Sequence, residues 1–286
     1  MKKIFCSLLF VVVILSFICT NSIYRKAGTY FIVNMYKNKK MRAYIKGNGK
    51  ALILLSGWAT ENPIDDFKPL IDELSYNFKV VALEYFGYGK SDIVETDRSN
   101  KTMVEEIRTA LVKLNIKPPY ILMPHSMSGL YCLYYANQYP NEVYAIIGLD
   151  MSLPQKQLER WTEKTFEKNK INTQSSDLNI SIVNQWNYFY TNSHELKNIK
   201  YDVKLPVLMF LASEQINSVN EMIKSGEMKT RWKTMNQNMI TNHKLQTIQI
   251  LQGGHYIYQN QCKQICQLTK QFLNNIDNMG KCMSAD

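Results

Sequence analysis

The sequence predicts an α/β fold: a mostly parallel central sheet with helices on both faces, and an inserted, largely helical cap. Two observations support this prediction. Short apolar runs alternate with amphipathic helical patterns along most of the chain, which is typical of a parallel sheet covered by helices. One long segment, about residues 152–204, interrupts the alternation without a strand pattern and is far longer than an ordinary connection. We expect this segment to form the cap.

The expected elements begin with a hairpin at residues 30–46, where strand-like runs flank Lys37-Asn38-Lys39. Most later strand patterns are continuous apolar runs, as in strands covered on both faces, and they lie at residues 51–55, 78–83, 121–123, 143–149, 206–211 and 245–251. Helical patterns lie between them, at residues 65–74, 102–115, 131–136 and 219–238, with a final amphipathic helix from Ile257 to Leu273. Thr102 is expected to cap its helix, with Glu105 as the reciprocal partner.

Residues 1–24 differ from the rest of the chain. Lys2 and Lys3 precede an apolar run from Ile4 to Cys19. The run is long for a signal-peptide core and short for a membrane-spanning helix of about 20 residues. We expect an uncleaved anchor that holds the protein at the cell membrane in a single pass, with the folded domain outside the cytoplasm. Cleavage as a signal peptide, followed by secretion, is the alternative.

The overall charge excludes one class of partner. Lys and Arg total 34 against 24 Asp and Glu, which gives a net charge of +10. The basic residues are scattered without a run of five, so we expect no nucleic acid partner, whereas an anionic membrane surface fits the charge.

The six cysteines do not indicate a disulfide framework. Cys262 and Cys266 are one helical turn apart, but no histidine lies near them, so packing is expected there and no metal site. The loop Gly87-x-Gly89 lacks the full dinucleotide pattern and no phosphate-binding loop occurs, so no cofactor is expected.

One turn concentrates the chemically useful residues. The apolar run that starts at Ile121 ends at Pro124, and a helical pattern follows Gly129. Ser126 therefore lies at a sharp turn between strand and helix, where its hydroxyl rises above the sheet edge over a helix N-terminus. Pro124 and Ser128 occupy the glycine positions of the usual pattern G-x-S-x-G. The simpler alternative is a strand–helix turn with an incidental serine.

Three other segments end at the same edge of the predicted sheet: Ser56-Gly57-Trp58, Glu214 and His255. A serine hydroxyl becomes a good nucleophile only when a nearby base accepts its proton, and a third group must orient that base. His255 is the candidate base. We predict Glu214 as the acid because it follows the strand at 206–211, and Asp150, which ends the strand at 143–149, is the alternative.

These motifs resemble those of the α/β-hydrolases, and the resemblance covers residues 30–276. Four of the six positions of the family's G-H-S-M-G-G elbow match, namely His125, Ser126, Met127 and Gly129. Three further stretches resemble the family's oxyanion turn H-G-x, its D-x-x-G-x-G-x-S loop and its G-H ending, and these are Ser56-Gly57-Trp58, Glu84 to Asp92, and Gly254-His255.

The resemblance implies a serine esterase or lipase-like hydrolase with an inserted cap, one that needs neither cofactor nor metal. It would cleave carboxylic esters, lipid-like ones included, through an acyl-enzyme on Ser126 with His255 as general base. The backbone N–H groups of Trp58 and Met127 would form the oxyanion hole. An epoxide or haloalkane hydrolase is disfavoured, because those enzymes need an aspartate where Ser126 stands.

Two alternatives to esterase activity remain. The first is other triad chemistry on the same fold: a C–C hydrolase, a haloperoxidase-like enzyme or an aminopeptidase. The second is a non-catalytic binding protein with a degenerate site.

Three further residues are candidates for the substrate pocket. His125 is expected to pack beside the serine or to shape the pocket. Trp161 and Trp186 belong to the cap segment, and they are candidates either for acyl binding or for the core of the cap.

Overall fold

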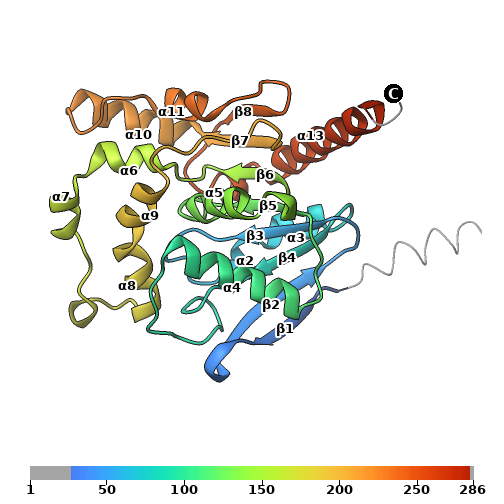
Figure 1. The fold of residues 1–286 in the computed structure, drawn as a ribbon, viewed down its shortest axis with the longest axis horizontal. Coiled ribbons are helices and arrows are strands. Elements are labelled where there is room, and N and C mark those ends of the chain that lie inside the picture. Colours follow the sequence, from blue (N-terminus) through green and yellow to red (C-terminus); the bar gives the residue numbers. More distant parts are fainter. Residues whose placement is uncertain (1–26, 284–286) are drawn as a thin grey trace, which may run out of the picture.

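The computed structural model describes residues 27–283, and the predicted N-terminal segment at 1–24 lies outside them. The described chain forms an eight-stranded sheet in the order β1-β2-β4-β3-β5-β6-β7-β8 (Figure 1). The strands span Thr29–Asn34 (β1), Lys40–Lys46 (β2), Ala51–Leu55 (β3), Lys79–Leu83 (β4), Tyr120–Pro124 (β5), Val143–Leu149 (β6), Val207–Ala212 (β7) and Gln246–Leu251 (β8). All pairs from β4 to β8 are parallel, and only β1 and β2 run antiparallel to their neighbours. The predicted fold class is confirmed.

The helices span Pro63–Asp66 (α2), Lys68–Leu74 (α3), Asn100–Lys113 (α4), Ser128–Gln138 (α5), Pro154–Arg160 (α6), Glu163–Glu167 (α7), Ile180–Asn187 (α8), Phe189–Glu195 (α9), Ser213–Lys224 (α10), Trp232–Met239 (α11), Ile257–Asn260 (α12) and Cys262–Met283 (α13). Short 3₁₀ helices occupy Tyr36–Asn38 (η1), Pro140–Glu142 (η2) and Thr173–Ser175 (η3). Among residues 27–283, no helix is long and apolar enough to span a bilayer.

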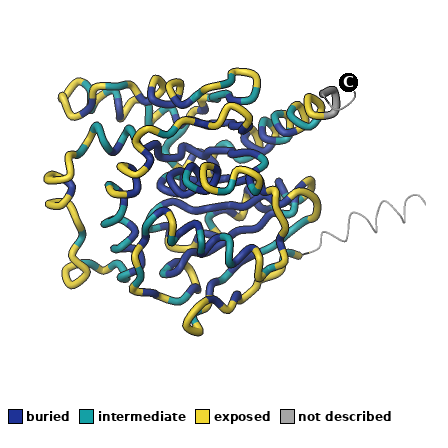
Figure 2. Tube along the Cα trace, in the orientation of Figure 1, coloured by how far each residue is buried: buried dark blue, intermediate teal, exposed yellow. Residues whose placement is uncertain are grey.

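The central strands are buried on both faces, as their continuous apolar runs predict. In β3, Ile53 and Leu55 pack into one hydrophobic core together with α4 and α5. Leu52 and Leu54 point to the opposite face and pack with α3 and α13. Figure 2 shows this pattern as a buried centre with exposed outer surfaces. The sheet is therefore the rigid middle layer from which the site is built.

Four helices, α6 to α9, lie between β6 and β7, beyond the left-hand end of the sheet in Figure 1. Between Asp150 and Pro206 the structure contains no strand, as the sequence pattern indicates. This segment is called the cap below.

Four expected helices differ from the observed ones. The pattern at 65–74 is divided into α2 and α3, and the pattern from Ile257 to Leu273 is divided into α12 and α13. The pattern at 219–238 is two helices, α10 and α11, separated at Gly226, where φ is +81°. Glycine tolerates this left-handed conformation and so permits the break. At the start of α4 the N-cap residue is Ser99 and not Thr102, because Ser99 Oγ accepts the Thr102 N–H at 3.2 Å.

Candidate active site

Ser126 lies at the turn between β5 and α5, and its φ of +52° is in the left-handed region. A non-glycine residue in this conformation is strained and persists only where its surroundings enforce it. The Ser126 N–H donates to Leu149 O, and the His125 N–H donates to Leu55 O at 2.9 Å. Neighbouring strands thus fix the turn and leave the Ser126 side chain half-buried.

The two departures from the usual glycine pattern are both accommodated. Pro124 is the last residue of β5, where it pairs with Leu55. Ser128 is buried, and its hydroxyl donates to Ser56 O at 2.5 Å and accepts from the Tyr85 hydroxyl at 2.8 Å. A small side chain with satisfied hydrogen bonds therefore replaces the glycine without a buried polar penalty.

The side chains of Ser126, His255 and Asp150 form one hydrogen-bonded chain. His255 Nε2 lies 2.8 Å from Ser126 Oγ, and His255 Nδ1 lies 2.7 Å from Asp150 Oδ2. The Asp150 side chain is fully buried, whereas that of His255 is 35% exposed. With Asp150 ionised, Nδ1–H donates to the carboxylate and Nε2 is left to accept the serine proton. This is the arrangement that activates a serine nucleophile.

Asp150 is held in place by more than the histidine. Its backbone N–H donates to Phe210 O at 2.8 Å. Its Oδ1 accepts the Ala212 N–H at 3.1 Å and the Trp232 indole N–H at 3.4 Å. Two N–H groups therefore orient the carboxylate through Oδ1, in addition to the contact of Oδ2 with His255.

The expectation that Glu214 would contact His255 is wrong. Strand β7 runs directly into α10 at Ser213, so no loop presents Glu214 to the site. Its carboxylate lies instead beside Gly254, where Glu214 Oε2 is 3.0 Å from the position that a Cβ would occupy. Asp150, the alternative acid, makes the contact.

The two predicted oxyanion donors flank Ser126. Met127 follows it directly, and the turn that carries Trp58 approaches so closely that a Cβ on Gly57 would lie 2.9 Å from Ser126 Cβ. In residues 27–283, no acceptor is found for the backbone N–H of Trp58 or Met127. Both groups are thus free to bind an anionic oxygen at the serine.

His125 is fully buried, and its Nε2–H donates to His255 O at 3.1 Å. Its ring packs against Tyr256 and Tyr258, with centroids 4.8 and 5.1 Å away. Burial, with a smaller effect of His255, lowers the pKa of His125 to about 3. The imidazole is therefore neutral and supports the backbone of the His255 loop.

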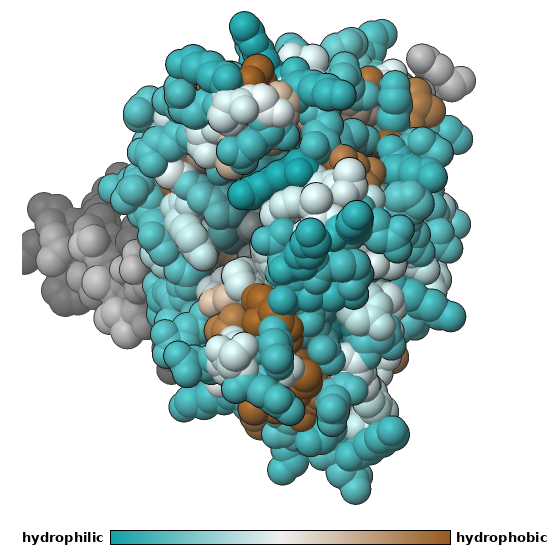
Figure 3. All heavy atoms as spheres, turned by 90° about the vertical axis from the view of Figure 1, so that its left-hand side faces the viewer, coloured by the Kyte–Doolittle hydropathy of each residue, from teal (hydrophilic) through white to brown (hydrophobic). Residues whose placement is uncertain are grey.

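The predicted pocket tryptophans lie close together. Trp186 is 4.9 Å from Trp58 and 5.7 Å from Trp161, measured between ring centroids. These rings, with Phe166 and Tyr190 of the cap, are called the aromatic cluster. Trp58, Trp161 and Trp186 are each partly exposed. Figure 3 views this end of the molecule, and hydrophobic side chains gather in one region of it.

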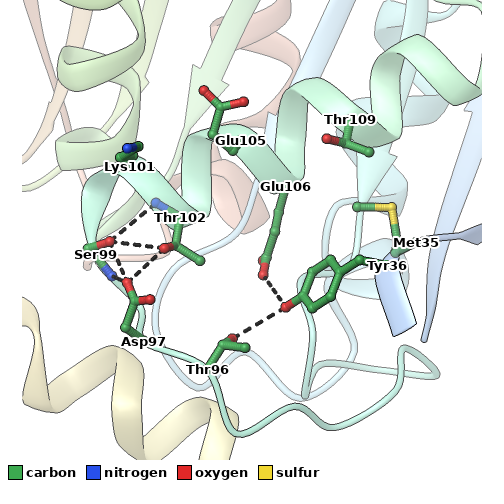
Figure 4. Close-up of a pocket in the computed structure, with 10 residues that line it drawn as sticks. All are labelled: Met35, Tyr36, Thr96, Asp97, Ser99, Lys101, Thr102, Glu105, Glu106 and Thr109. Carbon is green, nitrogen blue, oxygen red and sulfur yellow. Dashed lines mark hydrogen bonds between the residues drawn. The ribbon is translucent and has the colours of Figure 1, made fainter. Parts of the chain in front are cut away.

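A separate cavity of about 510 Å³ lies beside α4 and η1 (Figure 4). Several of its polar groups are bonded to one another: the Tyr36 hydroxyl donates to Glu106 at 3.2 Å, and Asp97 accepts from Thr102 Oγ1 at 2.7 Å. Neither Ser126 nor His255 lines this cavity, so it is separate from the candidate active site.

The fold and the serine–histidine–aspartate geometry define a class of protein, the hydrolases with a nucleophile on a strand–helix elbow. A family model described as "alpha/beta hydrolase fold" matches residues 50–282, and the chain belongs to that family.

Three curated relatives are similar over part of the chain. "Uncharacterized protein YbdG" of Bacillus subtilis is 42% identical over 119 residues, which are 41% of this chain and 37% of that protein. The "Pimeloyl-[acyl-carrier protein] methyl ester esterase" of Xanthomonas oryzae pv. oryzae is 30% identical over 100 residues, 35% of this chain and 36% of that one. The "2-(acetamidomethylene)succinate hydrolase" of Mesorhizobium japonicum is 26% identical over 107 residues, 37% of each. These matches span little more than a third of each relative.

Solved structures share the fold at low sequence identity. A "Putative Acyltransferase from Salmonella enterica" has a TM-score of 0.64 and 15% identity, covering 88% of this chain and 96% of that one. The "Epoxide hydrolase CorEH" has a TM-score of 0.62 and 15% identity, covering 87% and 100%. A "membrane phospholipase A" described as a bacterial virulence factor has a TM-score of 0.57 and 14% identity, covering 97% and 100%.

Proposed function

We propose that this protein is a serine hydrolase that cleaves carboxylic esters through an acyl-enzyme on Ser126. The observation that carries the proposal is the hydrogen-bonded chain from Ser126 through His255 to Asp150, with contacts of 2.8 and 2.7 Å. The distance of 2.8 Å between Ser126 Oγ and His255 Nε2 is short enough for His255 to accept the serine proton as a general base. Asp150 takes the acid role in place of Glu214.

Each catalytic step follows from these positions. His255 Nε2 removes the Ser126 proton as Oγ attacks the ester carbonyl, and buried Asp150 stabilises the imidazolium that forms. The N–H groups of Trp58 and Met127 bind the oxyanion. The imidazolium then protonates the departing alcohol, and His255 activates a water molecule that releases the acid from Ser126.

The position of the aromatic cluster favours a substrate whose acyl group is apolar and is bound by the cap. Its rings begin at Trp58, one residue after the glycine that packs on Ser126, and continue into the cap through Trp186. Partly exposed aromatic walls bind apolar groups and exclude water from them. The serine at position 126, with no aspartate there, argues against epoxide and haloalkane chemistry despite the likeness in fold.

The acid assignment gives the sharpest test of the mechanism. Asp150→Asn keeps the size of the side chain but removes the charge that stabilises the imidazolium, so turnover of p-nitrophenyl esters should fall by about 10⁴. Glu214→Gln is the matched control and should stay within a few-fold of the unmodified protein. The reverse pattern would return the acid role to Glu214.

Labelling by a fluorophosphonate separates a hydrolase from a non-catalytic binder. The unmodified protein should be labelled at Ser126. Ser126→Ala should abolish labelling and lower turnover by up to about 10⁶ without loss of the fold. Absence of labelling in the unmodified, folded protein would contradict the proposed function.

A further inference from the structure

The turn at residues 57–60, called the oxyanion turn below, needs external support. Ala59 has a φ of +57°, a left-handed conformation that is costly for a residue with a side chain. Thr60 Oγ1 donates to Gly57 O at 3.1 Å, which closes the turn internally. The direction of the Trp58 N–H depends on this backbone, so whatever holds Ala59 also aims the Trp58 donor.

Tyr88 supplies that support. Its hydroxyl oxygen accepts the Ala59 N–H at 3.0 Å, and the hydroxyl donates to Gln185 Oε1. Tyr88 and Gln185 are each 1% exposed. Burial raises the pKa of Tyr88 well above its usual range, so the phenol remains protonated and keeps both hydrogen bonds. One buried hydroxyl thus connects the oxyanion turn to the cap helix α8.

The loop from Glu84 to Asp92 is shaped to present Tyr88. Buried Glu84 accepts the Lys90 N–H at 2.8 Å, and a Cβ on Gly89 would lie 2.3 Å from the same carboxyl group. Gly87 has a φ of +85°, and its N–H donates to Asp92 O at 2.9 Å. Among residues 27–283, no hydrogen bond joins this loop to Ser126, His255 or Asp150, although its Tyr85 hydroxyl donates to Ser128 of the elbow. The loop places Tyr88 beside Ala59.

Helix α8 holds the oxyanion turn at a second point. The Trp58 indole N–H donates to Ile182 O at 2.9 Å, and the Trp58 ring packs on Trp186 of the same helix. The loop docks there as well, because Asn179, which caps α8, donates from Nδ2 to Gly87 O at 2.8 Å. The turn, the loop and the cap helix therefore form one connected unit.

We propose that Tyr88, supported by Gln185, is a positioning residue that aims the Trp58 N–H at the oxyanion, so that α8 of the cap sets the geometry of catalysis. The inference rests on the proposed function, since it assigns a support to the oxyanion hole of that reaction. A substrate that displaces α8 would change the direction of the Trp58 N–H as well as the surface that α8 presents to the acyl group.

Tyr88→Phe is the test, because it deletes only the hydroxyl and leaves the Ala59 N–H without an acceptor. Complete loss of one oxyanion donor costs about 10²–10³ in kcat, and a misaimed donor should cost about 10-fold or more, with KM nearly unchanged. Tyr120→Phe is the matched control: this buried tyrosine donates to Ile116 O at 2.9 Å, at the opposite end of β5. It should retain full activity.

Inhibition by an aliphatic trifluoromethyl ketone gives a readout that a merely structural role would not change. This inhibitor forms a tetrahedral oxyanion on the serine, so its Ki should rise in Tyr88→Phe in step with the fall in kcat/KM. Gln185→Leu, which keeps Tyr88 and removes only its acceptor, should shift both quantities in the same direction by less. It also provides the test if Tyr88→Phe does not fold.

The outcomes separate the inference from the proposed function. If the unmodified protein is labelled by the fluorophosphonate but Tyr88→Phe and Gln185→Leu match Tyr120→Phe in kcat and Ki, Tyr88 has no positioning role. If the unmodified protein is not labelled, the hydrolase proposal fails and the inference fails with it.

Discussion

The buried imidazole of His125 should make the protein sensitive to acid. Burial holds the pKa of His125 at about 3, against an ordinary value of 6.5. Between these two values the unfolded chain binds a proton that the folded protein does not, so stability falls as the pH falls. The lost stability amounts to about 2 kcal/mol near pH 5, because each unit of pKa difference corresponds to about 1.4 kcal/mol.

His125→Gln isolates this contribution. The glutamine amide can still donate to His255 O, but it cannot titrate. Urea unfolding near pH 7 and near pH 5 gives the free energy of unfolding of each protein at both values. The loss between the two conditions should be smaller in His125→Gln by about 2 kcal/mol. His194→Gln removes an exposed histidine of α9 and serves as control, with the loss unchanged. An identical loss in all three proteins would refute the assignment of acid sensitivity to His125.

Two further predictions concern the cap and the N-terminal segment. Trp161→Ala and Trp186→Ala should change the preference among p-nitrophenyl esters of rising chain length more than they lower the melting temperature. A lower melting temperature with an unchanged preference would show that the aromatic cluster stabilises the fold and does not bind the substrate. The full-length protein should be recovered in the membrane fraction, held there by residues 4–20, whereas a chain that begins near Lys26 should be soluble and active. Full-length protein found wholly in the soluble fraction with an intact N-terminus would exclude an anchor, and a new N-terminus near Asn21 would indicate signal cleavage.

The sheet was predictable because burial on both faces leaves a direct mark on the sequence. A strand such as β3, Ala51–Leu55, must be apolar at every position when helices cover both sides. The elbow was predictable for a similar reason, since a sharp turn between a buried strand and a helix admits few residue types. Ser126 and His255 could therefore be placed at one edge of the sheet before their contact was known.

The acid was not predictable, because the choice depends on side-chain positions that no local pattern records. Glu214 and Asp150 both follow buried strands, and both can reach the same edge of the sheet. What separates them is that α10 begins at Ser213 without a loop, while the Ala212 and Trp232 N–H groups converge on Asp150. The contact between Tyr88 and Ala59 was hidden in the same way, because it joins two loops far apart in the sequence.

The two ends of the cap are attached very differently. The first connection leaves β6 at Asp150 and reaches α6 at Pro154, and on the way the Ser152 N–H donates to Ser126 O at 2.7 Å. The last connection returns at the amino end of β7, where Tyr201 N–H donates to Met239 O and Gln246 Nε2 donates to Asp202 O. A length change before Pro154 would therefore shift the acid and the nucleophile together. Insertions into the cap are best made near residue 200, because the backbone there makes no hydrogen bond to Ser126, His255 or Asp150 among the residues that the structure describes.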